Sequence, residues 1–350
     1  MESNTFKIAD FNIRILFEES KKNGMWLLPS FDNFKSSEQT DDYFFTLTVD
    51  DSMRPSKDRK LVRKFDTGNC DTLVYQLPDG GYQYLIRDVY NRDCCLLITN
   101  EHFTDCRCAL NGDWTMRSFG LNDALMLIFA FAGSFRQTML IHASCIMYDG
   151  KGYPFTAQSG TGKSTHTSLW LKHIEGAELL NDDNPIIRIL DDGLPYIYGS
   201  PWSGKTPCYR NRRARLGAVT RIDRAPQNSI ERLAPIQAFA SLLPACSSMK
   251  WDPAIYRNLC DAVTRVIETT PVYTLHCLPD EEAARLSYAT LTKEYDDEER
   301  YKDHTNGQRR AAARGSQTAG RGTYRHPTPT RIQHASLLRE RTRQGPAAQA

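Results

Sequence analysis

The sequence predicts an α/β protein built on a mixed sheet, preceded by a small β-rich domain and followed by a disordered tail. Residues 1–115 contain alternating runs rich in β-branched and aromatic side chains, which are typical of strands. Residues 116–293 contain a strand, a glycine-rich loop and a helix in direct succession, as α/β folds do. From residue 294 onward apolar side chains become sparse and no longer show the spacing of a helix or a strand, so we expect residues 294–350 to be disordered.

Composition limits the class of protein. The 350 residues carry 44 Lys and Arg against 42 Asp and Glu, so charge alone gives no case for a polyanionic partner. The first residues lack the apolar core of a signal peptide, and no run of 18 apolar residues occurs. We therefore expect a soluble cytoplasmic protein without a membrane partner. The arginine-rich tail leaves nucleic-acid contact conceivable, but a nonspecific tail explains it better.

The ten cysteines are scattered along the chain, with no C-x-x-C pair. Reduced thiols in the cytosol explain this spacing better than disulfides. Cys106 and Cys108, with His102 nearby, are the one cluster that resembles metal ligands, and alternation along a strand explains them more simply.

Residues 1–115 are expected to form a sheet. Residues 6–17 and 43–49 are strand-like, and Asp-Gly-Gly at 79–81 between the runs 72–77 and 82–87 is a hairpin signal. No catalytic constellation is found there. We expect a sheet domain that supports, recognises or forms a homo-oligomer.

A nearly all-apolar segment at 122–134 predicts a buried core helix too short to span a bilayer. It leads into a strand at 140–148, a tight turn at 149–152 and a second strand at 153–157. This second strand is therefore entered through an antiparallel hairpin.

The run Ala157-Gln-Ser-Gly-Thr-Gly-Lys163-Ser164 fits the phosphate-binding pattern of a P-loop, and the following residues, to 173, predict a helix. Gly160 and Gly162 allow a sharp turn that aims N–H groups inward because no Cβ blocks the approach. The helix adds the positive end of its dipole. Lys163 is expected to reach the β- and γ-phosphates of ATP, and the Ser164 hydroxyl to ligate Mg²⁺. The expected cofactor-binding residues are Ser159, Gly160, Thr161, Gly162, Lys163, Ser164 and Thr165.

A strand at 178–181 runs into Asp182-Asp183-Asn184-Pro185. The intervening helix of about ten residues returns the chain by roughly 15 Å, enough to lay this strand beside the loop strand. The acid pair then stands at a carboxyl end of the sheet, where one carboxylate completes a Mg²⁺ shell and the other takes a proton from an attacking hydroxyl. A solvated Asx turn before proline is the structural alternative.

Further candidates lie on either side of the loop. Antiparallel pairing brings His142 near the mouth of the loop, although a lone strand histidine is usually structural. Lys205, in the turn-rich segment 199–205, is the first candidate for a cation that stabilises transferring phosphate. The second candidate is one of Arg210, Arg212 and Arg213.

The rest of the chain predicts packing elements. Asp-Asp-Gly at 191–193 reads as a hairpin turn. The expected strands and helices are a strand at 216–222, a helix at 236–243 opened by proline, a helix at 254–268, a strand at 272–278 and a last helix from 279.

The combination of His142, the hairpin, Ser159-Gly-Thr-Gly-Lys-Ser164 and Asp182-Asp183 resembles the catalytic domain of HPr kinase/phosphorylase. The runs Leu-Leu-Asn-Asp-Asp-Asn-Pro and Gly-Ser-Pro-Trp-Ser-Gly-Lys make it more similar to HPr-kinase-related proteins of unassigned substrate, over about residues 138–292. The resemblance implies an HPr-kinase-like P-loop domain over 116–293. The family's downstream signature around an Arg-Gly pair is replaced by residues 210–222, which argues against HPr itself as the acceptor.

The resemblance implies a kinase that transfers the γ-phosphoryl group of ATP to a hydroxyl on a protein, a peptide or a small molecule. Asp182 is then the acid/base with His142, Lys163 and Lys205 as further catalytic groups, and Ser164 and Asp183 hold Mg²⁺. Two alternatives stay open. The Ser-Gly-Thr-Gly-Lys core is also similar to phosphoenolpyruvate carboxykinase, and a nucleotide-binding regulatory module without phosphoryl transfer fits the same loop.

Overall fold

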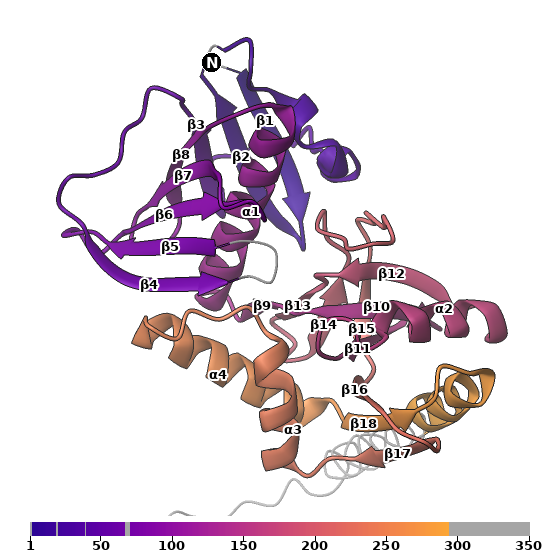
Figure 1. The fold of residues 1–350 in the computed structure, drawn as a ribbon. Coiled ribbons are helices and arrows are strands. Elements are labelled where there is room, and N and C mark those ends of the chain that lie inside the picture. Colours follow the sequence, from indigo (N-terminus) through magenta and orange to yellow (C-terminus); the bar gives the residue numbers. More distant parts are fainter. Residues whose placement is uncertain (1, 19, 39, 67–70, 294–350) are drawn as a thin grey trace, which may run out of the picture. The chain divides into compact units, whose positions relative to one another are not determined.

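Two sheets organise the chain as a mixed α/β protein (Figure 1). The computed structural model describes residues 2–18, 20–38, 40–66 and 71–293. These residues belong to one compact unit that extends over Met1–Asp297. The disorder expected for 294–350 concerns residues outside the described ranges, and the expected domain boundary at 115/116 stays a prediction.

The first sheet has eight strands in the order β1-β2-β3-β8-β7-β6-β5-β4. Only the β2/β3 and β3/β8 pairs within it are parallel. The alternation that predicted strands is visible as alternating burial along β2 and β3, whose inward side chains form the core of this sheet. The strands are β1 (Glu2–Ile8), β2 (Phe11–Phe17), β3 (Phe45–Val49), β4 (Lys60–Asp66), β5 (Asp71–Gln76), β6 (Tyr82–Arg87), β7 (Asp93–Thr99) and β8 (Asp105–Leu110).

The hairpin predicted at 79–81 joins β5 and β6, with Gly80 at φ 86°. Two 3₁₀ helices, η1 (Met25–Leu27) and η2 (Pro29–Phe34), lie between β2 and β3 in the chain. Phe31 and Phe34 of η2 are buried in the core of this sheet.

Helix α1 (Trp114–Ser134) begins eight residues before the expected apolar segment at 122–134. The Asp113 carboxylate caps it by accepting from the Met116 amide at 3.0 Å. The helix contacts β6, β7 and β8 of the first sheet and also helix α4 (Pro253–Thr269). This contact on several sides explains why its sequence is apolar nearly all round. Within the described ranges, no helix combines the length and apolarity that crossing a membrane requires.

The second sheet has ten strands in the order β17-β18-β16-β11-β15-β14-β13-β9, with β10 and β12 extending from β11. It combines parallel and antiparallel pairs, as predicted. The strands are β9 (Thr138–Leu140), β10 (Ala143–Tyr148), β11 (Lys151–Thr156), β12 (Glu178–Asp183), β13 (Ile186–Ile189), β14 (Pro195–Tyr198), β15 (Arg213–Leu216), β16 (Val219–Arg224), β17 (Ser229–Arg232) and β18 (Val272–Cys277).

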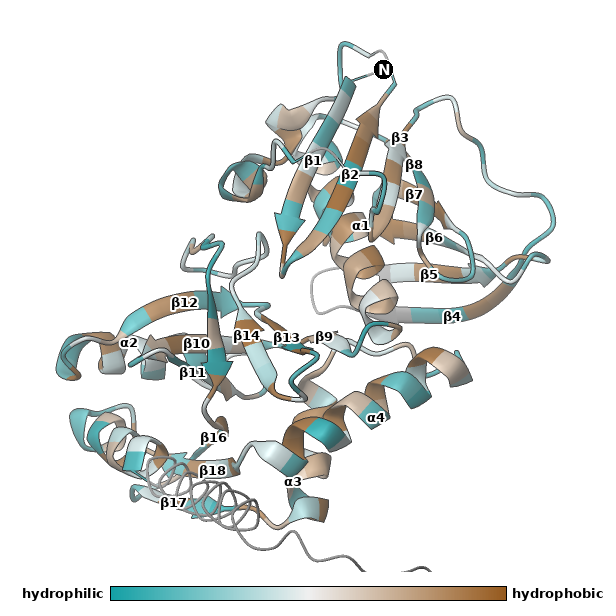
Figure 2. Cartoon of the chain, turned by 180° about the vertical axis from the view of Figure 1, so that it is seen from behind, coloured by the Kyte–Doolittle hydropathy of each residue, from teal (hydrophilic) through white to brown (hydrophobic). Residues whose placement is uncertain are grey.

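The helices of this second half are α2 (Lys163–His173), α3 (Pro235–Leu242), the 3₁₀ turn η3 (Leu243–Ala245), α4 and a helical segment at 281–293. They agree with the expected helices at 236–243 and 254–268 to within a residue. In Figure 2 hydrophilic and hydrophobic residues alternate along α4, whose buried positions follow the predicted helical stripe.

The arrangement of β10, β11 and β12 differs from the sequence expectation. Residues 178–181 were expected beside the loop strand β11, but β10 lies between β11 and β12 and is antiparallel to both. The tight turn at Asp149-Gly150, with φ of 47° and 72°, folds β10 onto that edge of β11 first. Since β11 and β12 are each antiparallel to β10, they run in the same direction and end at the same edge of the sheet.

The described cysteines are all free, and most are buried. Among the residues that the structure describes, no group of three His, Cys, Asp or Glu side chains is placed to hold a metal ion. Cys106 and Cys108 point into the core from β8, and His102 stacks on Phe135 at 5.0 Å between ring centroids. The simpler explanation of this cluster, alternation along a strand, is confirmed.

Candidate functional site

The loop between β11 and α2 is open to solvent. Residues 158–160 are exposed and 161–164 are partly exposed. Gly160 and Gly162 have φ of 78° and 127°, and a Cβ added at Gly160 would meet no atom within 4 Å. Glycine is therefore needed here for its backbone conformation.

The first hydrogen bond of α2 runs from the His166 amide to the Gly162 carbonyl, at 2.9 Å. The amides of residues 163–165 precede it and have no partner inside the helix. Together with the helix dipole, these amides can receive an anion at the loop. This geometry fits a phosphate group.

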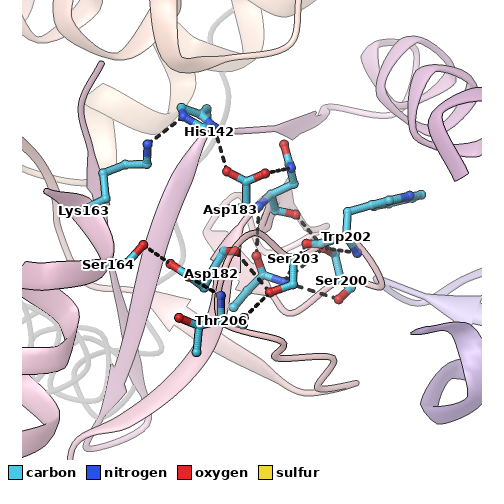
Figure 3. A network of polar contacts seen from close by, with 11 residues as sticks. His142, Lys163, Ser164, Asp182, Asp183, Ser200, Trp202, Ser203 and Thr206 are labelled. Carbon is cyan, nitrogen blue, oxygen red and sulfur yellow. Dashed lines mark hydrogen bonds and ion pairs between the residues drawn. The ribbon is translucent and has the colours of Figure 1, made fainter. Parts of the chain in front are cut away.

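Lys163, His142 and Asp183 form a chain of polar contacts beside the loop (Figure 3). Lys163 Nζ lies 2.6 Å from His142 Nε2, and His142 Nδ1 lies 3.0 Å from Asp183 Oδ1. The Lys163 ammonium can only donate, so His142 Nε2 accepts from it, while Nδ1 faces the Asp183 carboxylate. His142 thus connects the glycine-rich loop to the acid pair.

Burial lowers the pKa of Lys163 below its ordinary value, and the charges of Asp183 and Asp182 act in the opposite direction. The two acids therefore help to keep a partly buried ammonium charged. A charged ammonium is the form of a lysine that can bind an anion such as phosphate.

Ser164 and Asp182 form a second pair. Ser164 Oγ donates to Asp182 Oδ1 at 2.8 Å (Figure 3). Asp182 is 3 % exposed, and its other oxygen, Oδ2, accepts from the Thr206 amide at 3.2 Å. Asp182 is thus a buried carboxylate aimed at the first hydroxyl of α2.

Asp183 differs from its neighbour in exposure and backbone conformation. Its side chain is 33 % exposed, and its φ of 146° is rare for a residue with a side chain. Such a conformation costs on the order of 1–3 kcal/mol and persists only where surrounding contacts hold it. Asn184 Nδ2 donates to Asp183 Oδ2 at 2.7 Å, opposite His142. The partly exposed carboxylate thus lies between the Asn184 amide and His142.

The topology explains why these residues meet. His142 directly precedes β10, the glycine-rich loop follows β11, and the acid pair ends β12. Ala143 pairs with both Thr156 and Asp183 across the three strands. All three segments therefore lie at one edge of the sheet.

The other predicted site residues lie outside this group of contacts. Ser159 and Thr165 are exposed on the loop and the first turn of α2, and Thr161 is partly exposed. Lys205 is exposed and makes no hydrogen bond or ion pair with any described residue. Its neighbours Gly204 and Thr206 contact Asp182, so its backbone lies beside the acid pair. The role of Lys205 stays a prediction.

The predicted arginines are engaged elsewhere. Arg210 and Arg212 bind Glu178 at 2.6 and 2.8 Å, at the start of β12 and thus at the opposite end of that strand from the acid pair. Arg213 binds Asp10 at 2.9 Å. The structure does not bring these guanidinium groups to the phosphate loop.

Arg224 was not singled out in the sequence. Its Nε donates to the Thr161 carbonyl at 2.9 Å and its Nη2 to the Gly160 carbonyl at 2.6 Å. Thr156, the last residue of β11, pairs with Arg221 of β16. The three residues that follow Arg221 therefore carry β16 past the end of β11 to the loop.

Arg224→Ala should weaken nucleotide binding without unfolding the protein. Two carbonyls at the turn lose a charged donor at an exposed position, a loss of about 1 kcal/mol, or roughly fivefold to tenfold in Kd. Titration with a fluorescent ATP analogue measures this, with Arg285→Ala as the control because that exposed arginine binds, among the described residues, Glu281 of its own helix. Equal Kd values for Arg224→Ala and wild type would contradict the role.

His166, on the buried side of α2, provides a test of stability against pH. Its Nε2 lies 3.1 Å from Ser287 Oγ, and burial lowers its pKa to about 4. The unfolded chain titrates near 6.5, so between pH 6.5 and about 4 it binds a proton that the folded protein does not bind. Stability should therefore fall as pH falls through this window, by at most about 1.4 kcal/mol per pH unit from this group.

His166→Gln should flatten this part of the profile. Urea unfolding of wild type and variant at several pH values between 4 and 7 measures the difference. Other titrating groups contribute equally to both proteins, so parallel profiles would show that His166 is not responsible.

Comparison with known proteins adds little to this geometry. No family model and no curated protein matches the sequence. Among solved structures, the chain is similar to the Hpr(Ser) kinase/phosphatase from Coxiella burnetii, with 11% identity and a TM-score of 0.29 over 48% of this chain and 96% of that chain. A structural likeness this weak says nothing about activity. The proposed function therefore rests on the contacts within the site.

Proposed function

We propose that this protein is an ATP- and Mg²⁺-dependent kinase that transfers the γ-phosphoryl group to a hydroxyl acceptor. The observation that carries the proposal is the pairing of two units at one sheet edge. One unit is the Lys163–His142–Asp183 chain of polar contacts, and the other is the hydrogen-bonded Ser164–Asp182 pair. Within this proposal, residues 116–293 form an HPr-kinase-like P-loop domain.

The residues present fit Mg²⁺. Adjacent ligands in an octahedral Mg²⁺ shell lie roughly 3 Å apart, since each is about 2.1 Å from the ion. Ser164 Oγ and Asp182 Oδ1 are 2.8 Å apart, so both can occupy neighbouring positions in one shell. Mg²⁺ is usually held by one or two carboxylates together with substrate phosphates, so a large protein cage is not required. When bound, ATP and Mg²⁺ supply the phosphoryl group and neutralise its charge.

The contacts favour a division of roles opposite to the one expected from the sequence. Asp182, expected to be the base, is buried and has both oxygens engaged by Ser164 and Thr206, which suits a metal ligand. Asp183, expected beside the metal, is the more exposed of the two carboxylates and lies 3.0 Å from His142 Nδ1. We assign Asp183 as the group that takes the proton of the acceptor hydroxyl, with His142 orienting it.

The same contacts favour phosphoryl transfer over nucleotide binding alone. A binding module needs the loop amides and Lys163, but it does not need a strained, exposed carboxylate linked to that lysine through a histidine. A group that accepts a proton next to a phosphate loop is what a hydroxyl kinase requires.

Incubation of the purified protein with γ-labelled ATP, Mg²⁺ and fractionated cell extract tests the proposal. A kinase should place label on one or a few acceptors as an acid-stable, alkali-labile phosphoester, and omission of Mg²⁺ should remove it. Saturable ATP binding without any labelled product would contradict the kinase and favour the regulatory module.

A further inference from the structure

The segment 199–208, called the strap below, encloses Asp182. Ser203 Oγ donates to the Asp182 carbonyl at 3.1 Å, and the Gly204 amide donates to the same carbonyl. The Thr206 amide binds the Asp182 carboxylate. The Thr206 carbonyl, at 2.7 Å, is the nearer of the two acceptors for the single hydroxyl hydrogen of Ser203, whose oxygen also accepts from the Cys208 amide at 3.2 Å. The strap thus contacts both the carbonyl and the carboxylate of Asp182.

The strap is fastened to the first sheet by Trp202. This side chain is 2 % exposed and belongs to the core cluster of that sheet. Its ring lies edge-on to Phe31 of η2, with centroids 6.0 Å apart and an angle of 85° between the planes. It also contacts Phe129 of α1 at 5.4 Å. A buried aromatic side chain of this size is a large apolar anchor.

Hydrogen bonds hold the strap on both sides of this anchor. On the side of β12, buried Asn181 donates from Nδ2 to the carbonyls of Ser200 and Trp202, at 3.3 and 3.1 Å. Just beyond the strap, Asn33 Nδ2 of the first sheet's η2 donates to the Tyr209 carbonyl at 2.8 Å. The strap is therefore bound to both sheets.

We infer that the first sheet, whose role the sequence leaves open, holds the metal-binding acid of the site in place through the strap, with Trp202 as the positioning residue. The inference rests on the proposed function for the role of Asp182. Trp202 lies one residue before Ser203, so a shift of the indole moves the groups that hold Asp182. Without the anchor, the strap keeps its polar contacts but loses the buried ring that limits its motion.

Trp202→Ala in the full chain tests the inference, with two readouts. Hydrogen exchange of the Gly204 and Thr206 amides should accelerate at least about tenfold, because both donate to Asp182. The Mg²⁺ concentration that gives half-maximal phosphoryl transfer should rise about tenfold, while the Kd for an ATP analogue measured without Mg²⁺ stays unchanged. Trp26→Ala is the matched control, since Trp26 is 52 % exposed and lies outside the strap.

Trp202→Phe should return both the amide exchange rates and the half-maximal Mg²⁺ concentration to near their wild-type values. The indole Nε1 has no hydrogen-bond partner among the described residues, so a phenyl ring loses packing area but no hydrogen bond. If Trp202→Ala does not fold, Phe31→Leu serves as the second variant, because it removes the ring of the first sheet that contacts Trp202. Wild-type exchange of both amides in a folded Trp202→Ala or Phe31→Leu variant overturns the inference. The exchange readout needs no activity, so it separates this inference from the kinase proposal.

Discussion

Lys163→Ala should abolish phosphoryl transfer, with kcat lower by about a thousandfold or more. Lys163 is the first residue of α2, and its ammonium links the phosphate loop to His142 at 2.6 Å. Removing it deletes the cation that faces the transferred group, and such electrostatic contributions are typically worth about 10²–10³ in rate or more. Steady-state transfer to a labelled acceptor measures the loss.

Lys172→Ala is the matched control for this variant. Lys172 is exposed and lies in the last turn of the same helix, at the opposite end from the loop. Its removal should leave kcat within about twofold of wild type. A Lys163→Ala protein that retains more than a tenth of wild-type activity would show that the loop does not hold the transferred phosphate.

Asp183→Asn should lower kcat by about 10²–10⁴, because the amide keeps the shape of the side chain but cannot take a proton. The Mg²⁺ concentration for half-maximal activity should stay the same, since Asp183 contacts His142 and not Ser164. Asp182→Asn should act differently and raise the Mg²⁺ requirement, because Asp182 Oδ1 lies 2.8 Å from Ser164 Oγ. Rates measured across a Mg²⁺ titration separate the two.

The two substitutions are mutual controls, because both exchange one oxygen of a carboxylate for nitrogen. If Asp182→Asn lost the rate at unchanged Mg²⁺ requirement while Asp183→Asn raised that requirement, the roles would be those expected from the sequence. If both variants turned over normally, neither acid would be part of the site.

The loop and its surroundings could be predicted from the sequence because their signals are local. Gly160, Gly162 and Lys163 stand in a short pattern whose backbone and charge requirements are known. The turn at Asp149-Gly150 identified the hairpin and thereby placed His142 near the loop. The resulting group of His142, Lys163 and the acid pair lies together in the structure.

Features that depend on long-range contacts could not be predicted in this way. The position of β12 beside β10 depends on which edge of β11 the hairpin occupies, and the sequence of β12 does not specify this. Arg224 contacts residues more than sixty positions earlier in the chain, and no local pattern marks it. The sequence instead suggested the charge run at 210–213 as a source of a phosphate-binding cation. In the structure its arginines are paired with Glu178 and Asp10.

Trp202 shows the same limit. The run that contains it was noted for its lysine, and Lys205 is the exposed member of the strap. The buried tryptophan three residues earlier carries the contacts with Phe31 and Phe129. Only the pairing of distant elements shows that this residue connects the first sheet to the site.

The central claim is that the loop around Gly160 to Ser164 and the facing acids form a site for ATP. Isothermal titration of the wild-type protein with ATP in the presence of Mg²⁺ tests it most directly. We predict one saturable site with a Kd between about 1 μM and 1 mM, the usual range for enzyme substrates, weakened at least about tenfold in Lys163→Ala and unchanged in Lys172→Ala. The absence of saturable binding to the wild type at millimolar ATP, or equal affinity in Lys163→Ala, would contradict the account.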